Sequence, residues 1–121
     1  MAKLSEVAKK MITEVHPALV ATTSKAGKPN VSPKGSFRVL DDEHVGFAEI
    51  ASPRTIANLR DNPQISAIIF DPATRKGCRV WGKAEILESG DLVNAFKAEY
   101  APRKMKVNRI VKVAVEEEVV F

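Results

Sequence analysis

The residues best suited to chemistry in this chain are Ser52, Pro53, Arg54 and Thr55, at the start of a predicted helix. Serine is a preferred helix cap, and proline fits the first helical position because its missing N–H needs no partner there. Arg54 and Thr55 then lie beside the unpaired N–H groups and positive dipole end that bind anions. The pattern predicts a phosphate-binding turn, and an ordinary helix start with a solvated Arg54 is the alternative.

A second group of unusual residues lies in the two strand-like runs that precede this helix. The run NVSPKGSFRVL carries Pro33 and Gly35, which place a strand at a sheet edge or introduce a bulge. Backbone groups left unpaired there need partners, and a flat heterocycle with donors and acceptors along one edge would supply them. A bulge without a ligand explains the same residues.

Taken together, the broken strands and the helix turn define a candidate cofactor site with a polar ring-edge zone and an anion pocket. This shape suits flavin mononucleotide (FMN). Lys34 is predicted beside the ring edge that becomes negative on reduction, where its charge would raise the reduction potential. Glu49 is either a proton partner or a structural hydrogen-bond acceptor. The candidate cofactor-binding residues are Ser32, Pro33, Lys34, Phe47, Ala48, Glu49, Ser52, Arg54 and Thr55.

The elements that must position these residues are mostly strands. The chain of 121 residues is long enough for one domain, residues 1–121, with a single core. Helices are predicted at residues 4–15, within 52–63, and at 91–100 with Ser89 as the cap. Short turns and the lack of regular βαβ alternation favour a mainly β, six-stranded, closed antiparallel barrel. The six runs are ALVATT, NVSPKGSFRVL, VGFAEI, QISAIIFD, CRVWGKAEILE and VNRIVKVAVEEEVVF.

Composition narrows the class of protein further. The chain is 45% hydrophobic and 28% charged, has no apolar run of membrane-spanning length and no leader pattern, and is predicted to be cytoplasmic. The single Cys78 excludes an internal disulfide and is expected to be a buried, inert thiol. Because His16 and His44 stand in separate turns, no metal site is expected. The net charge of +4 favours anionic ligands, either phosphorylated small molecules or nucleic acid.

Three segments that span most of the chain resemble the FMN-binding split-barrel family, specifically small members of the pyridoxamine 5'-phosphate oxidase-like group. They are ALVATTSKAGKPNVSPKGSFRVLDDEHVGFAEI, SPRTIANLRDNPQISAIIF and RVWGKAEIL, the last with Gly82 at the position of a characteristic glycine. The resemblance implies a split barrel of Greek-key type and a homodimer with FMN at the subunit interface. It also implies that Arg54 and Thr55 contact the phosphate, and that residues 32–34 and 47–49 contact the ring and ribityl chain.

The chain also departs from this family's pattern. Gly77 stands near the position of a glutamine in true pyridoxamine 5'-phosphate oxidases, and the chain stops at Phe121 without their basic substrate-holding segment. Oxidation of pyridoxamine 5'-phosphate is therefore not expected. The apolar residues 119–121 are expected to pack on a partner, with a frayed terminus as the alternative.

Three functions remain open at this point. The first is a flavoprotein that exchanges electrons at the ring, as an oxidoreductase or a carrier, with the electron partner unknown. The second is a non-redox binding module for haem, deazaflavin or flavin storage. The third, a small basic barrel that binds nucleic acid, has less support because only Trp81, between Arg79 and Lys83, resembles a stacking platform.

Overall fold

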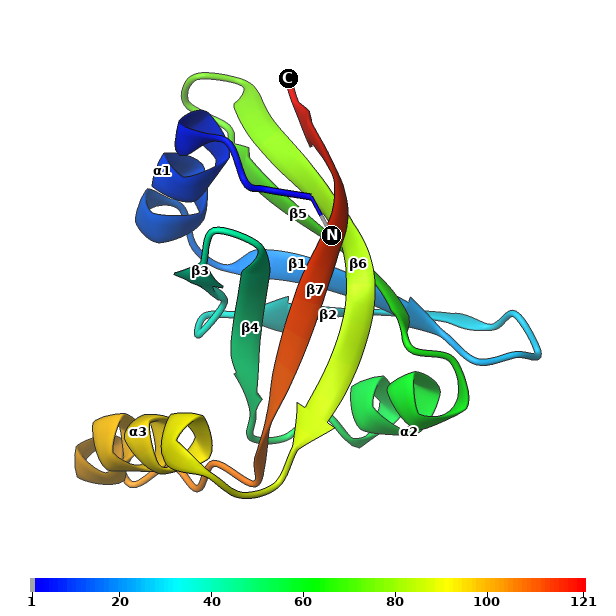
Figure 1. Ribbon diagram of the computed structural model, residues 1–121, viewed down its shortest axis with the longest axis vertical. Helices are drawn as coiled ribbons and strands as arrows, with labels where there is room; N and C mark the ends of the chain where they lie inside the picture. The colour runs from blue at the N-terminus through cyan, green and yellow to red at the C-terminus, as the bar shows by residue number, and fades with distance from the viewer. Residues whose placement is uncertain (1) are drawn as a thin grey trace.

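The computed structural model describes residues 2–121 and is mainly β, as predicted (Figure 1). The helices are α1 (Glu6–Glu14), α2 (Pro53–Asp61) and α3 (Asp91–Tyr100), with a 3₁₀ turn η1 (Ala101–Arg103). The strands are β1 (Ala18–Thr23), β2 (Pro29–Lys34), β3 (Arg38–Asp41), β4 (His44–Glu49), β5 (Gln64–Asp71), β6 (Lys76–Leu87) and β7 (Arg109–Val120). In residues 2–121, no helix has both the length and the apolar character needed to cross a membrane.

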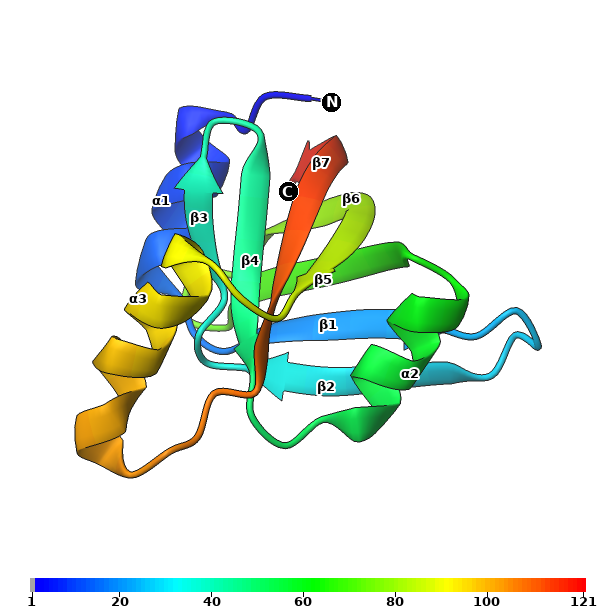
Figure 2. The ribbon, with the colours of Figure 1, turned by 60° about the horizontal axis from the view of Figure 1, so that its bottom comes forward.

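All seven strands pair antiparallel in one sheet, in the order β2-β1-β5-β6-β7-β4-β3. Strands β6 and β7 are the longest, at 12 residues each, and pair in the middle of the sheet. The sheet curls so strongly that β1, β2 and β5 cross the direction of β3 and β4 (Figure 2). Strong twist and coiling of this kind bring the two sheet edges toward each other.

The prediction of six strands in a closed barrel was wrong on both points. The run NVSPKGSFRVL forms two strands, β2 and β3, which are the two edges of the sheet and do not pair with each other. Between them the chain turns at residues 35–37, and Phe37 enters the core with 2% exposure. Pro33 cannot donate a ladder hydrogen bond, which suits an edge strand, and the turn then prevents one continuous strand.

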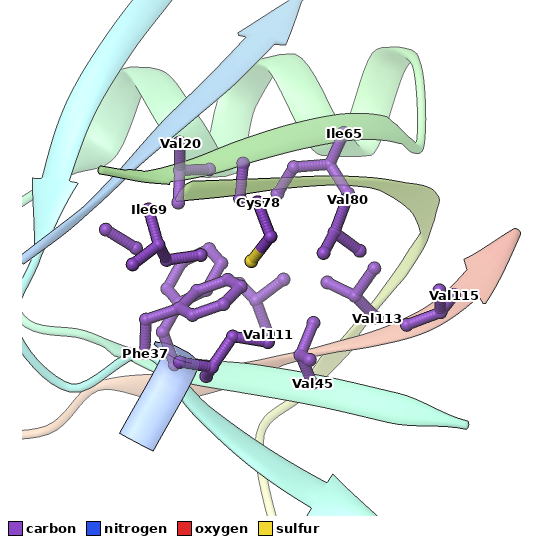
Figure 3. Close-up of a cluster of buried hydrophobic side chains, with 14 of the residues drawn as sticks. Val20, Phe37, Val45, Ile65, Ile69, Cys78, Val80, Val111, Val113 and Val115 are labelled. Atoms are coloured by element: carbon purple, nitrogen blue, oxygen red, sulfur yellow. The ribbon is translucent and has the colours of Figure 1, made fainter. Parts of the chain in front are cut away.

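The main hydrophobic core fills the concave side of the curled sheet (Figure 3). Phe37 and Phe47 stack there with ring centroids 6.2 Å apart, and Ile12 of α1 is fully buried against the same cluster. Cys78 also lies in this core with no exposed surface, and burial raises the pKa of its thiol to about 11. The prediction of a buried thiol is confirmed.

A smaller core cluster forms where α3 packs on the sheet. Val93, Phe96 and Tyr100 of α3 contact Ala48 of β4 and Ile110 of β7. The N-cap of this helix is Gly90, whose φ of 111° favours glycine. The prediction that Ser89 caps the helix was therefore wrong. The cluster fixes the C-terminal end of α3 beside the end of β4.

Candidate functional site

Two adjoining pockets run between β2, the loop from β4 to α2, and the end of α3. The narrow pocket, of about 270 Å³, is lined by Asn30, Val31, Ser32, Ala51, Ser52, Pro53, Arg54 and Thr55. The wide pocket, of about 500 Å³, is lined by Ser32, Pro33, Lys34, Gly35, Ser36, Ala48, Ile50, Ala51, Tyr100, Arg103 and Met105. Because both pockets share Ser32 and Ala51, they form one continuous groove, called here the β2–α2 groove.

The narrow pocket contains the first turn of α2. Ser52 occupies the N-cap position, as predicted, but its side chain makes no hydrogen bond to the helix. Its hydroxyl oxygen instead accepts a hydrogen bond from Lys34 Nζ. The N–H groups of the first turn therefore lack a side-chain cap and lie at the pocket wall, in the arrangement that binds anions.

Arg54 and Thr55 differ in their exposure on this turn. Arg54 is exposed and lines the narrow pocket, so its guanidinium is free to meet an anion. Thr55 is completely buried, and its Oγ1 accepts a long hydrogen bond of 3.5 Å from Asn30 Nδ2 on β2. Asn30 thus joins the edge strand to the helix turn, and both residues line the same pocket.

Lys34 is a buried lysine that lines the wide pocket, with 7% of its surface exposed. Its Nζ donates to Ser52 Oγ and lies 5.6 Å from the centroid of the Phe47 ring. Burial lowers the pKa of Lys34, and the nearby Glu49 carboxylate acts in the opposite direction. Lys34 is therefore not a solvated surface lysine.

Glu49 is buried at the end of β4 and uses both carboxylate oxygens within the protein. Oε2 accepts a hydrogen bond from the Ser52 N–H at 3.3 Å, and Oε1 lies 3.2 Å from Arg109 Nη1 in an ion pair. These contacts are those of a structural acceptor, the second of the two roles that the sequence left open for Glu49. The carboxylate holds the backbone that leads into α2.

The structure brings seven of the nine candidate residues to the groove. Phe47 and Glu49 do not line it, since side chains alternate along β4 and place both on the face opposite Ala48. Phe47 packs in the main core. The seven groove residues are Ser32, Pro33, Lys34, Ala48, Ser52, Arg54 and Thr55.

Several groove residues were not predicted. Ser36 ties the turn after β2 to β4, because its Oγ accepts a 2.8 Å hydrogen bond from the Ala48 N–H. Tyr100 and Arg103 close the wide pocket from the end of α3 and η1, with the Arg103 guanidinium 5.0 Å from the Tyr100 ring centroid. Residues 101–106 were recognisable as a basic loop, but nothing local indicated that the loop returns to β2.

The fold is thus an open, curled antiparallel sheet with a groove that ends at a helix N-terminus. The chain belongs to the pyridoxamine 5'-phosphate oxidase family, whose model matches residues 4–119. A search of proteins with curated functions finds no match.

Solved structures with the same fold extend over nearly the whole chain. HupZ from Group A Streptococcus is 29% identical, with a TM-score of 0.89 over 98% of this chain and 94% of that chain. A protein from Lactobacillus delbrueckii described as a putative pyridoxamine 5'-phosphate oxidase is 26% identical, with a TM-score of 0.82 over 97% and 93%. An FMN-binding protein from Syntrophomonas wolfei, 13% identical, shares the fold with a TM-score of 0.84 over 93% and 82%.

Proposed function

We propose that this protein binds FMN in the β2–α2 groove and exchanges electrons at the flavin ring, as an oxidoreductase or an electron carrier. The observation that carries the proposal is the continuity of the groove, which joins the uncapped first turn of α2 to a wider pocket bordered by Lys34. Membership of the family and a shared fold with an FMN-binding protein support it.

The residues of the groove fit the chemical parts of FMN. The first turn of α2 and the Arg54 guanidinium would hold the phosphate through backbone N–H groups and charge. The wide pocket, at about 500 Å³, has the volume of a small-molecule site and would take the ring, with Ala48 and Tyr100 as apolar walls and Lys34 at one edge. The flavin supplies the redox chemistry, while these residues bind, orient and tune it.

Oxidation of pyridoxamine 5'-phosphate is not part of this proposal. Gly77 stands near the family's glutamine, and a side chain at this position would clash with the Ile69 carbonyl oxygen. Both oxygens of Glu49 are engaged within the protein, with the Ser52 N–H and with Arg109, which supports a structural role for this carboxylate and not proton transfer with a substrate. We therefore assign the groove residues to cofactor binding and not to a reaction with pyridoxamine 5'-phosphate.

The first experiment is a visible absorption spectrum of the purified protein, recorded after incubation with FMN and removal of free ligand on a sizing column. Flavin absorption that co-elutes with the protein is the expected result. Parallel incubations with haem and with a deazaflavin test the non-redox alternatives. A protein that retains haem or deazaflavin but no FMN contradicts the proposal.

Combined substitution of the phosphate contacts provides a sharper test. Arg54→Ala together with Thr55→Val, which keeps the buried volume of Thr55, is expected to weaken FMN binding by about 100-fold, the value of one or two charge-assisted hydrogen bonds. Binding of riboflavin, which lacks the phosphate, should change little. Fluorescence titration of both flavins measures the two effects.

A matched control uses the other exposed arginine of the groove. Arg103→Ala, in the wide pocket, should leave the ratio of FMN to riboflavin affinity unchanged. Equal losses for FMN and riboflavin in the Arg54→Ala, Thr55→Val protein would show that the phosphate does not bind at α2.

We also propose that the protein is a homodimer with FMN at the subunit interface, and that it is cytoplasmic. Exposed apolar side chains at the end of β7 support the dimer, because a partner subunit would cover them.

A further inference from the structure

A set of polar contacts connects the start of β7 to the loop that precedes α2. The Asn108 N–H donates to the Glu49 carbonyl, and Asn108 Nδ2 donates to the Ile50 carbonyl, each at 3.0 Å. Arg109 Nη1 pairs with Glu49 Oε1 at 3.2 Å, while Glu49 Oε2 accepts from the Ser52 N–H. Two consecutive residues thus hold the backbone from residue 49 to residue 52.

Arg109 also reaches the opposite end of α2. Its Nε lies 3.5 Å from Glu88 Oε1, and the same carboxylate oxygen lies 3.2 Å from Arg60 Nη2 in the last turn of α2. Within residues 2–121 this Nε is buried and makes no hydrogen bond, so its interaction with Glu88 is an ion pair. The Arg109 guanidinium therefore connects the two ends of α2. It contacts Glu49 before the N-terminus, and through Glu88 it is linked to Arg60 in the last turn.

We propose that Asn108 and Arg109 are positioning residues that orient the first turn of α2 for the phosphate, an inference that rests on the proposed FMN function. Hydrogen bonds prefer donor angles above about 150° and weaken steeply below about 120°, so a rotation of this turn would misdirect several of its N–H groups at once. Neither residue lines the groove. Both act on the ligand through the backbone of residues 49–52.

This role predicts an effect on the phosphate end alone. Asn108→Ala and Arg109→Gln are each expected to weaken FMN binding about tenfold, the value of about one charge-assisted hydrogen bond, while riboflavin affinity changes by less than about twofold. Arg109→Lys keeps the charge but loses the fork that reaches two carboxylates, so its effect should be intermediate. Lys9→Gln, which removes the ion pairs of α1, is the control and should change neither affinity.

Hydrogen exchange on the ligand-free protein gives a second readout that does not depend on flavin. Two amides in this turn are hydrogen-bonded, that of Ser52 to Glu49 Oε2 and that of Ile56 to the Ser52 carbonyl. Both are expected to exchange faster in the Asn108→Ala and Arg109→Gln proteins, with exchange in β5 unchanged. Asn108→Ala keeps the Glu49–Arg109 ion pair. If loss of the Arg109 charge prevents folding, the Asn108→Ala protein alone tests the positioning role.

Equal weakening of FMN and riboflavin in the Asn108→Ala protein, or unchanged exchange at the Ser52 and Ile56 amides, would overturn the positioning role. Failure of the proposed function is a separate outcome, seen when the unmodified protein binds neither flavin. In that case the exchange of the first turn of α2 still decides whether Asn108 and Arg109 hold it.

Discussion

At the scale of single residues, Lys34 is the most informative side chain of the groove. A lysine ammonium is strongly hydrated, so its burial against Phe47 is unfavourable unless a partner compensates. Ser52 Oγ and the nearby Glu49 carboxylate provide that compensation. Because burial lowers the pKa of Lys34, the unfolded chain binds more protons than the folded protein between the lowered value and 10.5, and stability rises with pH across that interval.

Lys34→Met should lower the reduction potential of bound FMN. If the ammonium lies beside the ring edge that gains negative charge, its loss should cost roughly 1.4 kcal/mol, or about 30 mV for a two-electron couple. The difference between the two proteins should shrink as the pH rises through the lowered pKa of Lys34, because the amine then becomes neutral. Potentiometric titration at several pH values measures this. An unchanged potential at neutral pH would place the ring elsewhere.

The groove residues that could be predicted are those whose residue type and immediate sequence neighbours together indicate a local structure. Helix-start chemistry identified Ser52 and Arg54, and the broken strand identified Lys34, because both signals lie in a few consecutive residues. Phe47 and Glu49 were included with Ala48 since the face of a strand is not fixed until its pairing is known. Arg109 could not be found, because it is 60 residues from Glu49 and meets it only through the pairing of β4 with β7.

At the scale of elements, the pairing of β6 with β7 depends on a glycine. Gly82 lies at an irregularity in the register, next to Trp81, where β7 supplies an extra residue. A Cβ at Gly82 would clash with the Ala114 carbonyl oxygen and lie 2.6 Å from Val113 Cγ1. The backbones therefore approach closely at this point, which explains why glycine is required.

Gly82→Ala is expected to lower the free energy of unfolding by about 2 kcal/mol, since the added methyl group must displace backbone. Gly35→Ala is the matched control, because a Cβ at Gly35 meets nothing within 4 Å and its φ is not positive. Urea denaturation of both variants measures the difference. Equal stability of the two proteins would mean that the β6–β7 pair relaxes without cost.

The positions of the three helices were predicted correctly, whereas the number of strands was not. Apolar spacing located α1 and α3, and the Ser52-Pro53 start located α2, while Pro33 and Gly35 marked the point where one run divides into two strands. The division was missed because Phe37 continues the apolar pattern on the far side of the turn, so the run looked continuous. The direction in which Phe37 points depends on contact with Phe47, which is a property of the folded sheet.

At the scale of the whole molecule, four exposed apolar side chains gather where β5 and β7 end and β6 begins: Phe70, Val119, Val120 and Phe121. Phe121 stacks on Phe70 at 6.4 Å, and both remain more than 40% exposed. The backbone here is ordered, because Phe121 and Gly77 exchange two hydrogen bonds at 2.9 and 3.0 Å. A frayed terminus is therefore excluded, and a paired strand end with unburied phenyl rings is typical of a surface that another subunit covers.

If this surface closes a homodimer, Phe121→Asp should shift the protein toward monomer. Burial of one large apolar side chain is worth roughly 2 kcal/mol, and a symmetric homodimer buries it twice, so the dimer dissociation constant should rise about 1,000-fold. A carboxylate in its place adds a desolvation cost. The backbone bonds to Gly77 do not involve the phenyl ring and should persist, so the subunit itself should stay folded. Sedimentation velocity over a range of concentrations measures the shift, with Val7→Asp, an exposed apolar position on α1, as the control.

Because the proposed cofactor lies at the interface, the Phe121→Asp protein should also bind FMN more weakly at concentrations where it is monomeric. If the Phe121→Asp protein remains a dimer and keeps its FMN affinity, the exposed phenyl rings contribute neither to dimer formation nor to FMN binding.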